Sequence, residues 1–192
     1  MGIKTRVGYC SVAVVLALVS TNHKGEIRTS PAGLELLAGY EDCRTQAYLD
    51  IVGVPTCGIG STSGVRMGTT WTEAQVAAAF VKDVQAAEKC VLVYFNGYAM
   101  PQPVFDSVTS LVFNAGCWGT RWNTKLNRPT GIAQYAKAED WQNVCYRLGD
   151  FIYAGGKVSN GLKNRRAKEQ AHCVKWQVPQ QYEGSRWTPN PH

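Results

Sequence analysis

Three polar side chains suited to glycosidic bond cleavage lie close together in one short stretch of the chain. Glu41 is followed by Asp50 and then by Thr56, with Cys43 and Cys57 beside them. Such cleavage needs a carboxylic acid that protonates the leaving oxygen, and a second carboxylate that activates water or stabilises the developing positive charge. A hydroxyl group can hold the water. By spacing alone, the same residues also fit a solvent-exposed Glu and a hairpin Asp without any catalytic role.

The sequence around these residues predicts the elements that position them. Ser30 followed by Pro31 is typical of a helix start, and we expect this helix to carry Glu41 near its C-terminal end. Residues 47–60 are rich in Val, Ile, Tyr and Gly and contain a Gly53-Val54-Pro55 turn. This composition predicts a small hairpin or a three-stranded sheet that carries Asp50 and Thr56.

The rest of the chain is predicted to be mostly helical. Thr72 and Gln75 form a possible capping box at the start of a long helix that runs through Val91. Further helices are expected from Pro103 to residue 116, over 138–148 and over 162–176. The predicted fold class is therefore α+β and mostly helical, with a small β lobe, a long connecting helix and a helical C-terminal lobe. A cleft between two lobes is a usual place for a ligand site.

The amino-terminal segment combines positive charge with an apolar run. Lys4 and Arg6 precede an apolar stretch over residues 7–19, which is shorter than the ~20 residues of a stable transmembrane helix. It fits a cleaved signal peptide, although no convincing cleavage site follows. It also fits an uncleaved, weakly hydrophobic anchor that can later leave the membrane. We assign residues 1–26 to this segment and 27–192 to a catalytic domain, whose Pro-rich tail is expected to be extended or disordered.

Composition limits the partners and cofactors. The formal charge of +6 favours an anionic partner, which could be nucleic acid, an anionic membrane or an acidic polymer such as a bacterial cell wall. No nucleic-acid-binding signature is visible, so nucleic acid is not expected. The seven cysteines form no CxxC pair and the chain has three histidines, so no metal site and no cofactor are predicted. The cysteines instead predict disulfides in an oxidising compartment, with one thiol left over.

Taken together, these motifs resemble those of phage-type lysozymes (glycoside hydrolase family 24), over nearly all of residues 32–176. The resemblance lies in Glu41, Asp50 and Thr56 followed by CGIG, in LVFNAG at 111–116 and in GLKNRRAKE at 161–169. One departure is Ser61, where some members carry His.

By this resemblance, Glu41 is the general acid, Asp50 positions or activates the attacking water, and Thr56 assists. The implied reaction is an inverting hydrolysis of the bond between N-acetylmuramic acid and N-acetylglucosamine. The resemblance also implies that Phe113 lies in the saccharide cleft and that Arg166 contributes to substrate binding by pairing with Glu41.

The layout also resembles endolysins with a signal-anchor-release segment, which are exported tethered and inactive and then freed into the periplasm. We hypothesise that Cys43 pairs with Cys57 in the tethered form and with Cys10 in the released form. The alternative is that Cys43–Cys57 or Cys10–Cys43 is a permanent structural disulfide that does not exchange. Two structural disulfides are expected among the other cysteines, and the family's helix packing favours Cys90–Cys173 and Cys117–Cys145.

The expected function is therefore that of an endolysin that lyses the host for phage release. Its expected partners are peptidoglycan glycan strands and, through the N-terminal segment, the host inner membrane, and a monomer is expected. A lytic transglycosylase and a non-catalytic wall-binding or regulatory protein on a lysozyme scaffold are the alternatives. A zinc amidase would lack its ligands here, and a Cys/His endopeptidase would lack a credible His.

Overall fold

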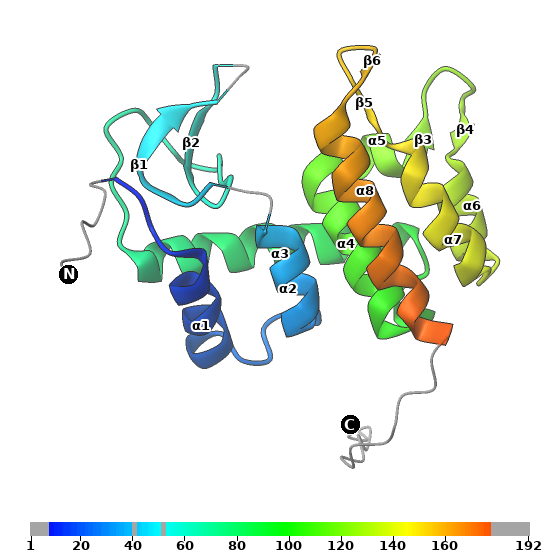
Figure 1. The fold of residues 1–192 in the computed structure, drawn as a ribbon, viewed down its shortest axis with the longest axis horizontal. Coiled ribbons are helices and arrows are strands. Elements are labelled where there is room, and N and C mark those ends of the chain that lie inside the picture. The colour runs from blue at the N-terminus through cyan, green and yellow to red at the C-terminus, as the bar shows by residue number, and fades with distance from the viewer. Residues whose placement is uncertain (1–7, 40–41, 51–52, 178–192) are drawn as a thin grey trace.

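One long helix, α3 (Glu73–Tyr94), connects a small β-containing lobe with a helical lobe in the computed structural model (Figure 1). The structure describes residues 8–39, 42–50 and 53–177. Thr72 caps α3, and both hydrogen bonds of the predicted capping box with Gln75 are present. The predicted fold class, a mostly helical α+β fold with two lobes and a connecting helix, is confirmed.

The β lobe is built around a hairpin of β1 (Arg44–Leu49) and β2 (Pro55–Gly58). The two strands are antiparallel, with Tyr48 opposite Thr56, and the register is irregular between Arg44 and Tyr48. Gly53 has a φ of +82°, which favours glycine in the turn between the strands. The predicted hairpin is therefore confirmed. Asp50 directly follows the last residue of β1 and begins the turn.

Two helices lie on the side of α3 away from the hairpin, one packed against α3 and the other against the central helix of the helical lobe (Figure 1). They are α1 (Val12–Asn22) and α2 (Pro31–Ala38). Val15 and Val19 of α1 are buried in the same core as α3. Within the described residues, no helix has the length and apolar character needed to cross a membrane.

The start of α2 is fixed by Ser30, which caps it with Pro31 in the first turn as predicted. The backbone N–H and the hydroxyl of Ser30 also donate to the carboxylate of Asp106, at 3.0 and 2.6 Å. Asp106 belongs to α4 (Gln102–Ala115), so this contact ties α2 to the helical lobe. The helix ends at Ala38, and Glu41 lies outside the described residues.

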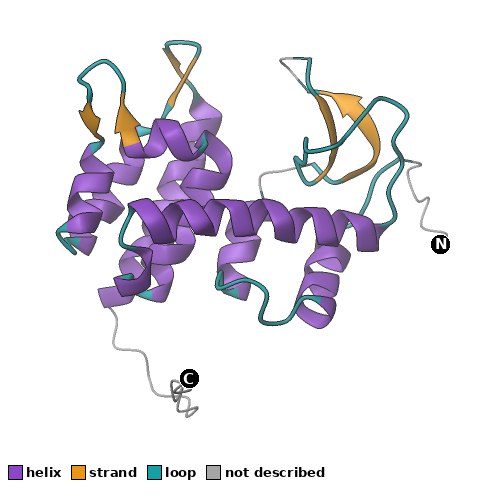
Figure 2. Cartoon of the chain, turned by 180° about the vertical axis from the view of Figure 1, so that it is seen from behind, coloured by secondary structure: helices purple, strands orange, loops and turns teal. Residues whose placement is uncertain are grey.

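Helices make up most of the second lobe (Figure 2). Its central helix is α4 (Gln102–Ala115), which is buried from Pro103 to Val112. The other elements of this lobe are η1 (Gly97–Ala99), α5 (Cys117–Arg121), α6 (Gly131–Lys137), α7 (Trp141–Arg147), η2 (Leu148–Asp150), α8 (Asn160–Cys173) and η3 (Val174–Gln177). Two short hairpins are β3 (Trp122–Asn123) with β4 (Arg128–Pro129), and β5 (Tyr153–Ala154) with β6 (Lys157–Val158). The Pro-rich tail predicted over 177–192 lies, beyond Gln177, outside the described residues.

The helix expected over 138–148 is present as α7, which begins only at Trp141 because Glu139 turns the chain with a φ of +57° and Asp140 caps the helix. The preceding helix α6, which Thr130 caps, was not predicted. The predicted disulfide pairings of this lobe are wrong: the bonds are Cys90–Cys117 and Cys145–Cys173. The reason is packing, because α3 contacts α5 and α7 contacts α8.

Candidate active site

An open cleft of about 660 Å³ lies between the hairpin and the C-terminal end of α4. It is lined by Arg44, Tyr48, Leu49, Asp50, Thr56, Gly60, Thr62, Phe113 and Asn114. Two of the three predicted catalytic residues, Asp50 and Thr56, therefore share one cleft. The third, Glu41, lies outside the described residues.

The carboxylate of Asp50 is held by the hairpin turn. The N–H of Val54 donates to Oδ1 of Asp50 at 2.8 Å, and the backbone N–H of Asp50 donates to the carbonyl of Val54 at 3.0 Å. The N–H of Gly53 closes the turn by donating to the carbonyl of Asp50 at 3.0 Å. The side chain is thus oriented by backbone groups, so its position depends on the hairpin.

Thr56 lies on β2 and is nearly inaccessible to solvent, with an exposed fraction of 3%. Its hydroxyl donates to the carbonyl of Val54 at 3.0 Å, which fixes the rotamer. A hydroxyl that donates in this way keeps its oxygen lone pairs for a water molecule. The same turn therefore orients both Asp50 and Thr56.

Phe113 lies in the last turn of α4 and packs against the cores of both lobes. Its ring meets Phe80 of α3 edge-to-face, with centroids 5.7 Å apart. It also lines the cleft. A role in the core and a place in the cleft are therefore combined in one side chain.

Arg166 is in a different position from the other predicted site residues. It is 1% exposed and does not line the cleft, and its Nε lies 2.8 Å from Oε2 of Glu169, which is fully buried. Its Nη2 donates to Oδ1 of Asn114, on the cleft wall, at 3.1 Å. Burial raises the pKa of Glu169, while the charge of Arg166 and a hydrogen bond from Ser110 oppose that rise. Arg166 thus holds the side chain of Asn114, which lines the cleft.

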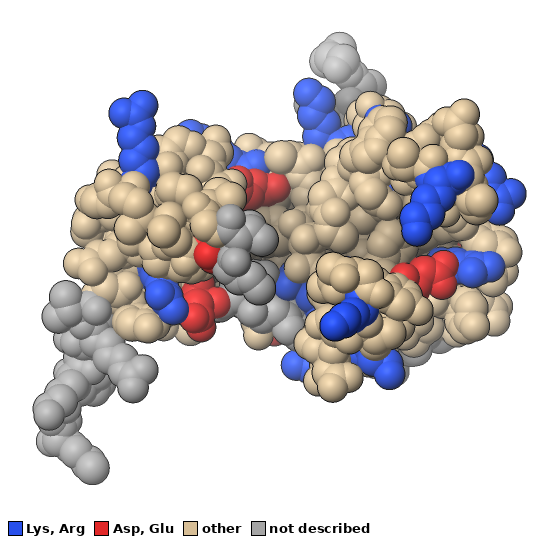
Figure 3. Space-filling model, turned by 90° about the horizontal axis from the view of Figure 1, so that it is seen from above, with Lys and Arg blue, Asp and Glu red and all other residues tan. Residues whose placement is uncertain are grey.

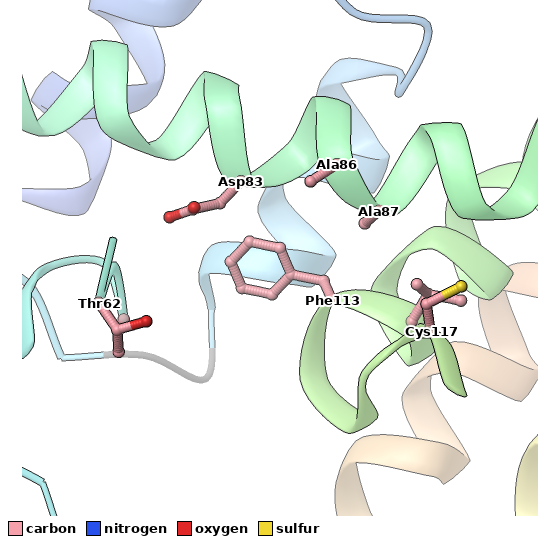
Figure 4. A pocket seen from close by; sticks show the side chains of 8 residues that line it. Thr62, Asp83, Ala86, Ala87, Phe113 and Cys117 are labelled. Atoms are coloured by element: carbon pink, nitrogen blue, oxygen red, sulfur yellow. The ribbon is translucent and has the colours of Figure 1, made fainter. Parts of the chain in front are cut away.

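A side pocket of about 300 Å³ shares Gly60, Thr62 and Phe113 with the cleft. Asp83 projects into it from α3, beside the ring of Phe113 (Figure 4). The hydroxyl of Ser61 donates to Oδ2 of Asp83 at 2.5 Å. Burial raises the pKa of Asp83, and this hydrogen bond partly offsets the rise.

Charge is spread over the face of the molecule that is drawn in Figure 3. In the view from above, Lys and Arg side chains are distributed over both lobes, and acidic side chains lie between them (Figure 3). This distribution differs from the single basic stripe that is typical of a nucleic-acid interface.

Sequence reasoning missed several side chains at the cleft and its side pocket, among them Arg44, Tyr48, Asn114 and Asp83. A signal was present for Tyr48. Successive side chains of a strand point to opposite faces, so Tyr48 and Asp50 share a face by their spacing of two. Asn114 and Asp83 have no such signal, because α3 and α4 meet the hairpin only in the folded chain.

The cysteines near the site are in one of the two states predicted for them. Cys10 is bonded to Cys43, with a Cα–Cα distance of 5.1 Å. Cys57 is a free, buried thiol, and its Sγ lies 3.5 Å from the carbonyl oxygen of Arg44. Burial raises the pKa of the Cys57 thiol.

Comparison with known proteins identifies the family. Residues 38–169 match the family model described as phage lysozyme. The chain is 39% identical over 169 residues to the SAR-endolysin of Escherichia phage P1, covering 86% of this chain and 90% of that protein. It is 36% identical over 174 residues to the SAR-endolysin of Haemophilus phage HP1, covering 86% of this chain and 94% of that protein. The chain belongs to the phage lysozyme family and is a lysozyme-type hydrolase that resembles the SAR-endolysins.

Solved structures agree and also distinguish two states. The active form of P1 phage endolysin Lyz matches with a TM-score of 0.83 and 36% identity, over 91% of this chain and 99% of that one. The secreted inactive form of the same endolysin matches with a TM-score of 0.57 and 32% identity, over 80% and 99%. The present structure is therefore closer to the active form of that relative.

Proposed function

We propose that this protein is a muramidase endolysin that hydrolyses the β-1,4 bond between N-acetylmuramic acid and N-acetylglucosamine in peptidoglycan and so lyses the host cell. The observation that supports this most is the pair of Asp50 and Thr56, oriented by one turn on the wall of a cleft in a chain of the phage lysozyme family. The cleft is open at its surface, as a polymeric substrate requires.

Each residue has a defined role in this proposal. Glu41 protonates the leaving glycosidic oxygen as the general acid. Asp50 accepts a proton from the attacking water, and the lone pairs of Thr56 help to orient that water. Phe113 gives an apolar contact for a sugar ring. The reaction is an inverting one, because water attacks directly and no covalent glycosyl-enzyme forms.

The product identifies the reaction. Digestion of purified Gram-negative sacculi, followed by mass spectrometry, is expected to give fragments ending in N-acetylmuramic acid, each one water heavier than the 1,6-anhydro product of a lytic transglycosylase. Anhydro ends would overturn hydrolysis and support the transglycosylase. Binding of the protein to sacculi without new ends would support a non-catalytic role.

We propose that the state with Cys10 bonded to Cys43 is the released, active state. In the tethered state, Cys43 is bonded to Cys57 and Cys10 lies in the membrane. On release, the Cys10 thiolate attacks the sulfur of Cys43, a Cys10–Cys43 bond forms, and Cys57 leaves as the thiolate and is protonated. This exchange needs no external oxidant or reductant.

The hairpin register explains how a Cys43–Cys57 bond would inactivate the enzyme. Arg44 is opposite Gly58, so Cys43 and Cys57 are diagonal neighbours. Diagonal positions lie about 7–8 Å apart, which is beyond the usual reach of a disulfide. The bond therefore requires a different arrangement of β1 and β2, the strands that orient Asp50 and Thr56. Peptide mapping without reduction tests this: identical bonds in the membrane-bound and released pools would overturn the exchange.

The proposed location follows from the same scheme. The N-terminal segment holds the protein at the host inner membrane, facing the periplasm, and release frees it into the periplasm as a monomer. Fractionation of host cells before and after membrane depolarisation tests the scheme, with a shift from membrane to periplasm expected and an unchanged membrane fraction contradicting it.

A further inference from the structure

The released N-terminal segment extends the sheet of the β lobe. The N–H of Cys10 donates to the carbonyl of Cys43, and the N–H of Thr45 donates to the carbonyl of Gly8, both at 3.0 Å. Tyr9 and Arg44 therefore form an antiparallel bridge. They are a non-hydrogen-bonded pair, the kind in which opposite side chains lie closest.

This pairing brings the Arg44 guanidinium close to two aromatic rings. The Cζ atom of Arg44 lies 5.3 Å from the ring centroid of Tyr9 and 4.3 Å from that of Tyr48. Both distances are within the range of cation–π contacts. Tyr9 comes from the released segment and Tyr48 from β1, so this arrangement forms only when the two are paired.

Arg44 and Tyr48 both line the catalytic cleft. The guanidinium pairs with the exposed Asp42 at 3.3 Å, and such exposed pairs contribute little. The Arg44 side chain is 32% exposed. Because it also lines the cleft, it presents there a positioned cation that a substrate can reach.

We propose that Arg44 binds the carboxylates of the peptides attached to the glycan strand, and that Tyr9 is the positioning residue that holds Arg44 for this contact. This inference rests on the proposed function, because it takes peptidoglycan as the substrate. Guanidinium groups bind carboxylates through paired, charge-assisted hydrogen bonds. The peptides branch from the sugars that occupy the cleft, so their carboxylates pass along its walls. Release of the N-terminal segment thereby completes substrate binding as well as exchanging the disulfide.

The test compares intact sacculi with sacculi whose carboxylates have been converted to amides, using kcat and KM for new reducing ends. The wild-type protein is expected to show a KM about tenfold higher on the amidated wall, as loss of one charged hydrogen bond predicts. Arg44→Gln is expected to have this higher KM on both walls, with kcat nearly unchanged. Arg128→Gln is the matched control, because it removes the same charge from β4, outside the cleft, and is expected to keep the wild-type preference.

Two variants of Tyr9 test the positioning role. Tyr9→Leu is expected to raise KM on the intact wall about threefold, whereas Tyr9→Phe keeps the ring and the wild-type value. Peptide mapping must show the Cys10–Cys43 bond in every variant. If Arg44→Gln fails to fold, the Tyr9 pair and the wild-type preference still decide the matter.

The proposal is overturned if the wild-type protein does not distinguish the two walls, if Arg44→Gln retains the preference, or if Tyr9→Leu and Tyr9→Phe behave alike. Failure of the proposed function has a different signature, since the wild-type protein would then release no reducing ends from either wall.

Discussion

Nη2 of Arg166 donates to Oδ1 of Asn114 at 3.1 Å, so a buried arginine of α8 holds a side chain on the wall of the cleft. Arg166 is in turn paired with Glu169, which also accepts a hydrogen bond from Ser110 of α4 at 2.7 Å. The helical lobe therefore contributes to the site through a buried charge network that joins α4 and α8.

We expect Glu169→Ala to lower the free energy of unfolding by about 3–5 kcal/mol, because it leaves the charge of Arg166 buried without its carboxylate. Denaturant unfolding measures this. Asp150→Ala is the control: Asp150 pairs with Arg147 at 3.3 Å on the surface, and its loss should change the free energy of unfolding much less, because exposed ion pairs contribute little. If the two substitutions lowered the free energy of unfolding equally, the buried ion pair would contribute no more to stability than a surface pair.

Much of the fold could be predicted because its signals are local. Ser30–Pro31, the Thr72–Gln75 box and the turn at Gly53 each mark an element boundary with a few neighbouring residues. The two disulfides of the helical lobe could not be predicted, because they depend on which helices pack together. The candidate site shows the same division. Asp50 and Thr56 could be predicted because they lie in one hairpin, whereas Asn114 could not, because it reaches the cleft only through tertiary packing.

Asp83→Asn is expected to stabilise the protein at neutral pH, by less than about 1 kcal/mol because the group is partly solvated. Burial raises the pKa of Asp83 in the folded state, so the folded state binds the proton more tightly than the unfolded state does. Its contribution to stability therefore falls as pH rises from the unfolded pKa through the higher folded pKa. Asparagine does not ionise, so Asp83→Asn avoids this loss of stability. The stability difference between the variant and the wild type should therefore disappear near pH 3, where Asp83 is protonated.

Thermal unfolding of wild type and Asp83→Asn between pH 3 and 7 measures the difference. Asp140→Asn is the comparison, because hydrogen bonds from Asn143 lower the pKa of Asp140 and the pH trend should have the opposite sign. If the stability difference from wild type changed with pH in the same direction for both variants, the opposite pKa shifts given to Asp83 and Asp140 would be contradicted.

Cys57 is expected to resist alkylation in the released protein. Its thiol is buried and its pKa is raised, so little reactive thiolate is exposed. Mass spectrometry after brief iodoacetamide treatment should find Cys57 unmodified in the folded protein and fully modified in denaturant. In the tethered protein, Cys10→Ser should prevent the exchange and leave Cys57 unavailable even in denaturant until a reductant is added. Ready labelling of Cys57 in denatured Cys10→Ser protein without reductant would contradict the Cys43–Cys57 bond.

Thr56→Val is expected to reduce kcat about a hundredfold, because the methyl group cannot orient water. Thr56→Ser keeps the hydroxyl and should retain most of the activity. Asp50→Asn is expected to lose at least as much as Thr56→Val, since an amide cannot accept the proton. Initial rates on sacculi, with circular dichroism to confirm folding, measure all three. Equal rates for Thr56→Val and Thr56→Ser would remove Thr56 from the reaction.

The most direct test of the muramidase assignment is clearing of outer-membrane-stripped Gram-negative cells by the released protein and by Glu41→Gln, at equal amounts and with matching folded spectra. The account predicts rapid loss of turbidity with the wild-type protein and none with the variant. Equal clearing by the two proteins would contradict it.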